Sequence, residues 1–228
     1  MQLHTVKIFS RDDIKTLKGY SCSGSIIDVN WIITSAHCVY GFAIIDVFIG
    51  NVTNDRDHIV RVSNVFLHPD FENEDEVIND IALLKLRRSL RTLNNRFDIV
   101  ALPNAADGEK DYVGLKGIIA GYGKVGDSGA TTNVANFAYY EILPLKECRN
   151  LFLHNYTQYT SSSLCGRGID ASSCQGDSGQ GLIIYKQGVK KIIGIVSKGF
   201  ESCEIIEPEV FTRVDKFVDF IQEVIKNY

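Results

Sequence analysis

The sequence predicts an all-β protein, a barrel or a sandwich, that ends in an amphipathic helix. Short runs rich in Ile, Val, Phe and Tyr recur along the 228 residues, and Gly, Asn, Asp and Ser separate them. Such runs are typical of short strands joined by turns. Residues 213–228 place apolar side chains at helical spacing, with charged side chains opposite them.

Eight segments carry the strand pattern. In chain order they are residues 24–36 (GSIIDVNWIITSA), 42–50 (FAIIDVFIG), 58–67 (HIVRVSNVFL), 80–86 (DIALLKL), 115–123 (LKGIIAGYG), 135–143 (ANFAYYEIL), 181–186 (GLIIYK) and 190–198 (KKIIGIVSK). A short second helix is expected at residues 144–152, after Pro144. The acidic run at residues 72–76 is expected to be a solvated loop. The sequence has no repeat and no obvious linker, and its length allows one domain or two small lobes.

Charge and hydropathy exclude two classes of protein. The formal net charge is −4 and no basic stripe is visible, which argues against nucleic acid as the main partner. No apolar run approaches the length that a membrane-spanning helix needs.

Cysteine usage indicates an oxidising compartment. The chain has six dispersed cysteines, with no CxxC pair and no zinc spacing: Cys22, Cys38, Cys148, Cys165, Cys174 and Cys203. The sequons at Asn51 and Asn155 are compatible with a secreted glycoprotein. The first residues lack the charged and apolar regions of a signal peptide, so we expect that such a peptide has been removed or that the chain starts inside a longer precursor.

Three separated segments carry residues suited to nucleophilic catalysis. WIITSAHC ends a predicted strand at His37, NDIALLKL places Asp80 directly before a buried strand, and CQGDSGQG places Ser178 in a glycine-rich turn. A serine hydroxyl needs a neighbouring base, a group that orients the base, and donors for the oxyanion. The order His, Asp, Ser is one known order of this constellation.

These segments resemble the chymotrypsin/trypsin-type serine endopeptidases. TSAHC resembles the TAAHC motif of that family, NDIALLKL its DIALL segment, and GDSGQGL its GDSGGP motif. Further likeness lies in CSGSIID, in GYG at 121–123 and in PEVFTRVDKFVDFI, so the resemblance runs from about residue 22 to the C-terminus.

The resemblance implies a fold of two six-stranded antiparallel Greek-key β-barrels with a C-terminal α-helix. The peptidase domain would cover residues 1–228, with lobes at about 1–105 and 106–213 and the helix at 214–228. The implied disulfides are Cys22–Cys38, Cys148–Cys165 and Cys174–Cys203. The implied catalytic residues are His37, Asp80 and Ser178, with the N–H groups of Gly176 and Ser178 as the oxyanion hole. Ser197 is implied to hydrogen-bond the aspartate and to contact the substrate backbone.

The implied specificity pocket departs from the usual pattern. Ser172 stands at its base, where an aspartate would imply cleavage after Lys or Arg. Glu209 stands at a position that is usually Gly. Either Glu209 divides the pocket and pairs with a basic side chain, or it obstructs the pocket or points away. Gly199 keeps the entrance open, and Lys198 replaces an aromatic residue.

The resemblance also implies a zymogen whose cleaved amino terminus pairs with Asp177. No Ile-Val-Gly-Gly-like tetrapeptide is visible before Cys22. This sets an alternative to a secreted, active endopeptidase, namely a catalytically weak or inactive homologue that binds or regulates a partner.

The implied partners are a polypeptide substrate and a protein protease inhibitor. We expect a secreted monomer with no cofactor and no metal, which binds neither nucleic acid nor membrane.

Overall fold

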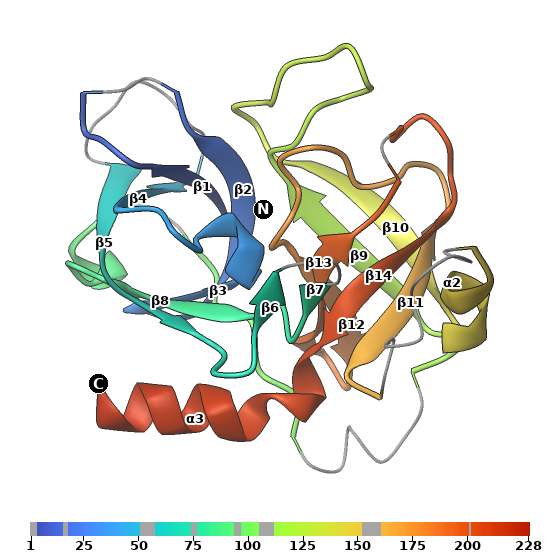
Figure 1. Cartoon of the computed structure of the whole chain (residues 1–228). Coiled ribbons are helices and arrows are strands. Elements are labelled where there is room, and N and C mark those ends of the chain that lie inside the picture. Colours follow the sequence, from blue (N-terminus) through green and yellow to red (C-terminus); the bar gives the residue numbers. More distant parts are fainter. Residues whose placement is uncertain are drawn as a thin grey trace.

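Two closed six-stranded antiparallel barrels stand side by side in the computed structural model (Figure 1). The structure describes residues 4–15, 18–50, 58–73, 77–93, 97–104, 112–151, 161–200 and 202–228. The prediction of two six-stranded β-barrels with a C-terminal helix is therefore confirmed. None of the helices in these ranges has the length and apolar character needed to cross a membrane.

The first barrel has the strand order β1-β2-β3-β8-β5-β4. Its strands are β1 (Thr5–Arg11), β2 (Tyr20–Asp28), β3 (Trp31–Thr34), β4 (Ile44–Ile49), β5 (Ile59–Leu67) and β8 (Ala82–Leu86). The run predicted at 24–36 is divided because the N–H of Asn30 donates to Asp28 Oδ1 at 2.9 Å, an Asx turn that separates β2 from β3. Residues of the acidic run form strand β6 (Glu72–Asn73), which pairs with β7 (Val77–Ile78) instead of remaining a loop, although both β6 side chains are exposed.

The second barrel has the strand order β10-β11-β14-β13-β12-β9. Its strands are β9 (Lys116–Gly121), β10 (Asn136–Leu143), β11 (Ser163–Gly168), β12 (Gly181–Lys186), β13 (Val189–Lys198) and β14 (Pro208–Arg213). Strand β10 shows how the sequence sets the faces: Ala138, Tyr140 and Ile142 are buried, while the residues between them are exposed.

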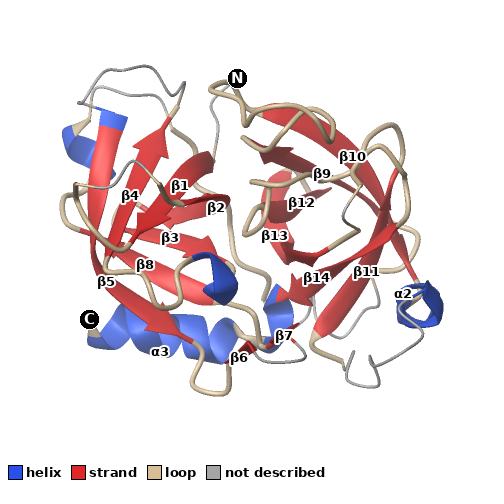
Figure 2. Ribbon diagram, turned by 45° about the horizontal axis from the view of Figure 1, so that its top comes forward, coloured by secondary structure: helices blue, strands red, loops and turns tan. Residues whose placement is uncertain are grey.

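The helices are short, and the two α-helices lie at the outside of the barrels (Figure 2). They are the 3₁₀ turns η1 (Ala36–Cys38), η3 (Leu90–Thr92) and η4 (Val214–Lys216), and the α-helices α2 (Leu145–Leu151) and α3 (Val218–Asn227). The expected C-terminal helix thus becomes α-helical only at Val218, after one 3₁₀ turn.

An apolar cluster joins the barrels to each other and to α3. It includes Ile33 and Leu83 from the first barrel, Ile195 from the second, and Phe217 and Ile221 at the helix. Each is at most 5% exposed, so this contact contributes core-like burial and fixes one barrel relative to the other.

Candidate active site

His37 lies in the 3₁₀ turn η1, directly after β3 leaves the first barrel. The disulfide Cys22–Cys38 ties this turn to β2. The hydroxyl of Ser35 donates to the carbonyl of Val196 in the second barrel at 2.7 Å. The turn that carries His37 is therefore anchored to both barrels.

Asp80 is 2% exposed and lies two residues before β8. Its Oδ1 accepts from the backbone N–H of His37 at 2.9 Å, and its Oδ2 lies 2.7 Å from His37 Nδ1. The hydroxyl of Ser197 on β13 donates to the same Oδ2 at 2.6 Å. A carboxylate in this position favours the tautomer with the proton on Nδ1, which leaves Nε2 free to accept a proton.

The turn around Ser178 is held by backbone hydrogen bonds to both barrels. The N–H of Ser23 on β2 donates to the Ser178 carbonyl, and the N–H of Gly179 donates to the Val196 carbonyl, both at 2.9 Å. Gly179 has a φ of +84°, and a Cβ there would lie 2.1 Å from Thr34 Oγ1. A glycine is needed at this position because neither the conformation nor the space admits a side chain.

Two contacts bring Ser178 to the side of His37. The sulfur of Cys38 lies 3.5 Å from the Ser178 carbonyl oxygen. The ring of Tyr20 meets the His37 ring edge-on with centroids 6.5 Å apart, and the Tyr20 hydroxyl interacts with that of Ser178. Burial and the charge of Asp80 raise the pKa of Tyr20. Sequence reasoning missed Tyr20, since nothing in its neighbourhood distinguishes it from other strand tyrosines.

Gly176 adopts a φ of +101°, which favours glycine. The N–H of Lys124 donates to the carbonyl of Gln175 at 2.9 Å. In a trans peptide the N–H points away from the carbonyl, so this bond also fixes the direction of the Gly176 N–H.

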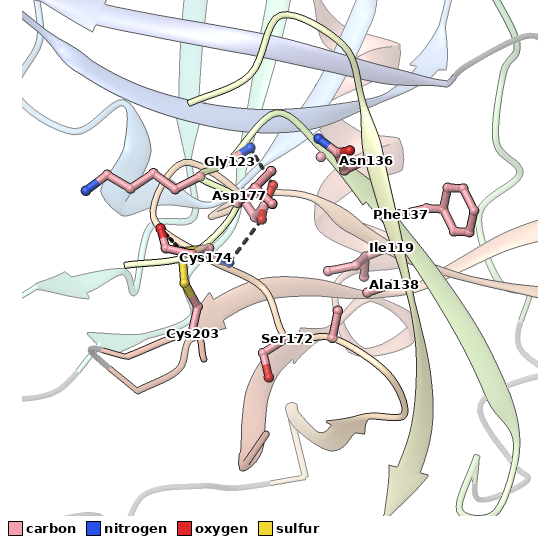
Figure 3. Close-up of a pocket in the computed structure, with 14 residues that line it drawn as sticks. Ile119, Gly123, Asn136, Phe137, Ala138, Ser172, Cys174, Asp177 and Cys203 are labelled. Atoms are coloured by element: carbon pink, nitrogen blue, oxygen red, sulfur yellow. Dashed lines mark hydrogen bonds between the residues drawn. A yellow bond between two sulfur atoms is a disulfide. The ribbon is translucent and has the colours of Figure 1, made fainter. Parts of the chain in front are cut away.

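Asp177 is 9% exposed and accepts from two backbone groups, Gly123 N at 2.8 Å and Cys174 N at 3.0 Å (Figure 3). Burial raises the pKa of Asp177 to about 6, against these hydrogen bonds, which lower it. A pocket of about 280 Å³ opens beside the carboxylate, and Ser172 and Phe137 are among its lining residues. Gly121 and Gly123 leave room for the carboxylate, because a Cβ on either would collide with it.

Glu209 is 3% exposed on β14. Its Oε1 accepts from the Tyr140 hydroxyl at 2.8 Å and from the N–H of Ser173 at 3.1 Å, and its Oε2 accepts from the Ser173 hydroxyl. Gly199 lies against it, since a Cβ there would be 3.4 Å from Glu209 Cγ. Burial raises the pKa of Glu209 to about 7. In the part of the chain that the structure describes, its partners are neutral donors and no cationic side chain pairs with it.

The other expected site residues are placed as follows. The hydroxyl of Ser172 donates to the carbonyl of Ile205 at 3.4 Å. The disulfides are Cys22–Cys38, Cys148–Cys165 and Cys174–Cys203. Asn51 and Asn155, the two sequon asparagines, lie outside the described residues. Tyr140 and Ser173, the partners of Glu209, were missed because the sequence does not reveal which strand faces a buried acid.

Two comparisons with known proteins identify the family and the fold of the chain. The family model described as Trypsin matches residues 4–221. A solved structure titled "HL collagenase structure at 1.7 Å resolution" is similar with a TM-score of 0.83 and 25% sequence identity, covering 98% of this chain and 93% of that chain. With a family match over nearly its whole length and the two-barrel fold of that structure, the chain belongs to the trypsin family of serine proteases.

Proposed function

We propose that the protein is a secreted serine endopeptidase in which Ser178, His37 and Asp80 form the catalytic triad. The observation that carries this proposal is the double hydrogen bond between His37 and Asp80, at 2.7 and 2.9 Å, beside the Ser178 turn. Three disulfides support an oxidising, extracellular setting. We further propose that the protein is a monomer and that its substrate is a polypeptide. A protein inhibitor is proposed to bind at the same site as the substrate.

The chemistry follows from the positions of the protons. Ser178 Oγ attacks the peptide carbonyl carbon while His37 Nε2 takes the hydroxyl proton, and Asp80 stabilises the imidazolium. The N–H groups of Gly176 and Ser178 bind the oxyanion, and each such donor is worth about 10²–10³-fold in rate. His37 then gives its proton to the leaving amine, and water hydrolyses the acyl-enzyme by the same route in reverse.

The proposed primary pocket is bounded by Ser172, Gly199 and Glu209, with Ser197 contacting the substrate backbone. Glu209 lies against Gly199, which supports a divided pocket. Its neutral form suits an aromatic side chain, and its charged form suits a basic one. We therefore propose cleavage after aromatic or basic residues.

Asp177 is proposed to receive an ammonium group in the active form, as in a zymogen family. In the described residues this buried carboxylate accepts from two backbone donors; a cation would stabilise it further, and the neighbouring pocket is open to one.

A serine-directed phosphonate tests the proposal. We expect an adduct on Ser178 in the purified protein and none in Ser178→Ala, with both proteins giving the same circular dichroism and melting temperature. Peptide libraries that vary the residue before the scissile bond then test the preference. A folded protein that gives no adduct even after limited proteolysis has freed a new amino terminus would refute the enzyme and favour the homologue that acts by binding.

A further inference from the structure

Ser23 on β2 contacts the nucleophile turn through both its backbone and its side chain. Its N–H donates to the carbonyl of Ser178 at 2.9 Å, and its hydroxyl donates to the carbonyl of Gly176, also at 2.9 Å. These are the two residues whose N–H groups are the proposed oxyanion donors. One residue of the first barrel therefore holds the carbonyl of each donor residue in the second.

The hydroxyl of Ser23 is buried and acts both as a hydrogen-bond donor and as an acceptor. Its oxygen also accepts from the N–H of Tyr122 at 3.3 Å, and the residue is 0% exposed. The Ser23 carbonyl in turn accepts from Thr34 Oγ1 at 2.8 Å. With a donor and an acceptor on either side, this hydroxyl has one orientation that satisfies all its neighbours.

Lys7 reinforces the same contact from the neighbouring strand. It lies directly opposite Ser23 in the β1–β2 pair. Its Nζ donates to Thr131 Oγ1 at 3.1 Å and to the Thr132 carbonyl at 3.2 Å. The methyl group of Thr131 lies against Gly176, where a Cβ would be 3.1 Å away.

Further hydrogen bonds connect the contacts of Lys7 with those of Ser23. The N–H of Thr132 donates to the carbonyl of Tyr122 at 3.0 Å, and the N–H of Tyr122 donates back to Ser23. Lys7 and Ser23 therefore both bind the segment 122–132, which lies on one side of Gly176. Ser23 also binds the Gly176 carbonyl on the other side.

We infer that Ser23, assisted by Lys7, is a positioning residue: it binds the carbonyls of Gly176 and Ser178, fixes the peptide planes that follow these two residues, and so holds in place the backbone whose N–H groups are proposed to bind the oxyanion. The inference rests on the proposed endopeptidase function, since it assigns Ser23 a role in that reaction. Because Ser23 would act through the turn and not on the substrate, its removal is expected to change kcat and to leave KM nearly unchanged.

Ser23→Ala and Ser25→Ala form a matched pair for the test. Ser25 lies two residues along the same strand, is equally buried, and accepts from the N–H of Gly181 at 3.2 Å. We expect Ser23→Ala to lower kcat about tenfold or more with KM within about twofold, and Ser25→Ala to lower the melting temperature similarly with kcat within about twofold. Equal kcat losses in the two variants would mean a merely structural role and would overturn the inference.

Lys7 keeps the test decisive if Ser23→Ala does not fold. We expect Lys7→Met to lower kcat about threefold and Lys7→Arg to restore it, because Arg keeps the charge and the donors. An unchanged kcat in Lys7→Met would then overturn the inference. If the wild-type protein itself takes no phosphonate, the endopeptidase proposal fails instead, so the two failures are distinguishable.

Discussion

The two barrels share one architecture but bury their carboxylates differently. In the first barrel, Asp46 accepts from Arg11 at 2.7 Å and from Arg61 at 2.8 Å, and Asp80 is paired with His37. In the second, Asp177 and Glu209 accept only from neutral donors in the described part of the chain.

The buried acids of the first barrel are therefore suited to orienting a neighbouring group, whereas those of the second barrel are suited to changing their charge with pH. The first barrel holds its acids with partners that carry or can carry positive charge, which suits a group that must orient a base. The second barrel holds acids whose pKa values rise to about 6 and about 7, so their charge changes near neutral pH. The half with the proposed nucleophile and the proposed pocket is therefore the half whose buried acids titrate near neutral pH.

The largest expected effect comes from Asp80→Asn. The amide would favour the wrong His37 tautomer, so kcat should fall by about 10⁴-fold on a chromogenic peptide while the fold persists. Asp46→Asn is the matched control, since Asp46 is also buried in the first barrel: it should lower the melting temperature and leave kcat unchanged. An Asp80→Asn protein with a tenth of normal activity would contradict the proposed triad.

Glu209→Gln should remove a pH dependence of stability that belongs to the second barrel. The folded pKa of about 7 lies above the ordinary 4.5, so the folded state holds the proton more tightly. The contribution of Glu209 to stability is then greatest below about pH 4.5 and falls as the pH rises towards and through 7, by about 3 kcal/mol.

Urea denaturation at pH 5 and pH 8 measures this change. The glutamine can accept from Tyr140 and Ser173, so the variant should lose little at pH 5 and exceed the wild type at pH 8. Glu223→Gln, on the exposed side of α3, should leave the dependence intact. Parallel pH curves for wild type and Glu209→Gln would show that Glu209 does not titrate in this range.

In the first barrel, His4 should give a pH dependence of stability with the opposite sign. It is 7% exposed, its Nε2 has no hydrogen-bond partner in the described structure, and burial is the main cause that lowers its pKa from 6.5 to about 4. The folded state is therefore destabilised when His4 is protonated. The contribution of neutral His4 to stability is complete above about pH 6.5 and is lost as the pH falls through about 4.

His4→Phe should accordingly be more stable than the wild type by roughly 2 kcal/mol at pH 4.5 and differ little at pH 7.5. Chemical denaturation at the two pH values measures the difference. An advantage that is the same at both would point to packing rather than to titration.

The strand pattern predicted an all-β protein, and the spaced motifs predicted the two barrels through the family resemblance, because both features can be recognised without knowledge of tertiary contacts. Strand β11, by contrast, was missed, since SLCGRG has neither alternation nor β-branched residues and is a strand only through its pairing with β10 and β14. The same limit applies to the site. His37, Asp80 and Ser178 stand in recognisable motifs, but Tyr20, Ser23 and Tyr140 reach the site by contacts across strands or barrels, which no local pattern encodes.

The smallest expected effect tests the hydroxyl of Ser197, which links the second barrel to the carboxylate of Asp80. Ser197→Ala removes the 2.6 Å hydrogen bond to Asp80 and leaves both bonds from His37, so kcat should fall only about three- to tenfold. If Ser197 acts through the carboxylate, Ser197→Ala should cost little further kcat in an Asp80→Asn background, and a double-mutant cycle measures this coupling. Losses that simply multiply would mean that Ser197 acts on the substrate backbone alone, and that orientation of the base is supplied entirely by the first barrel.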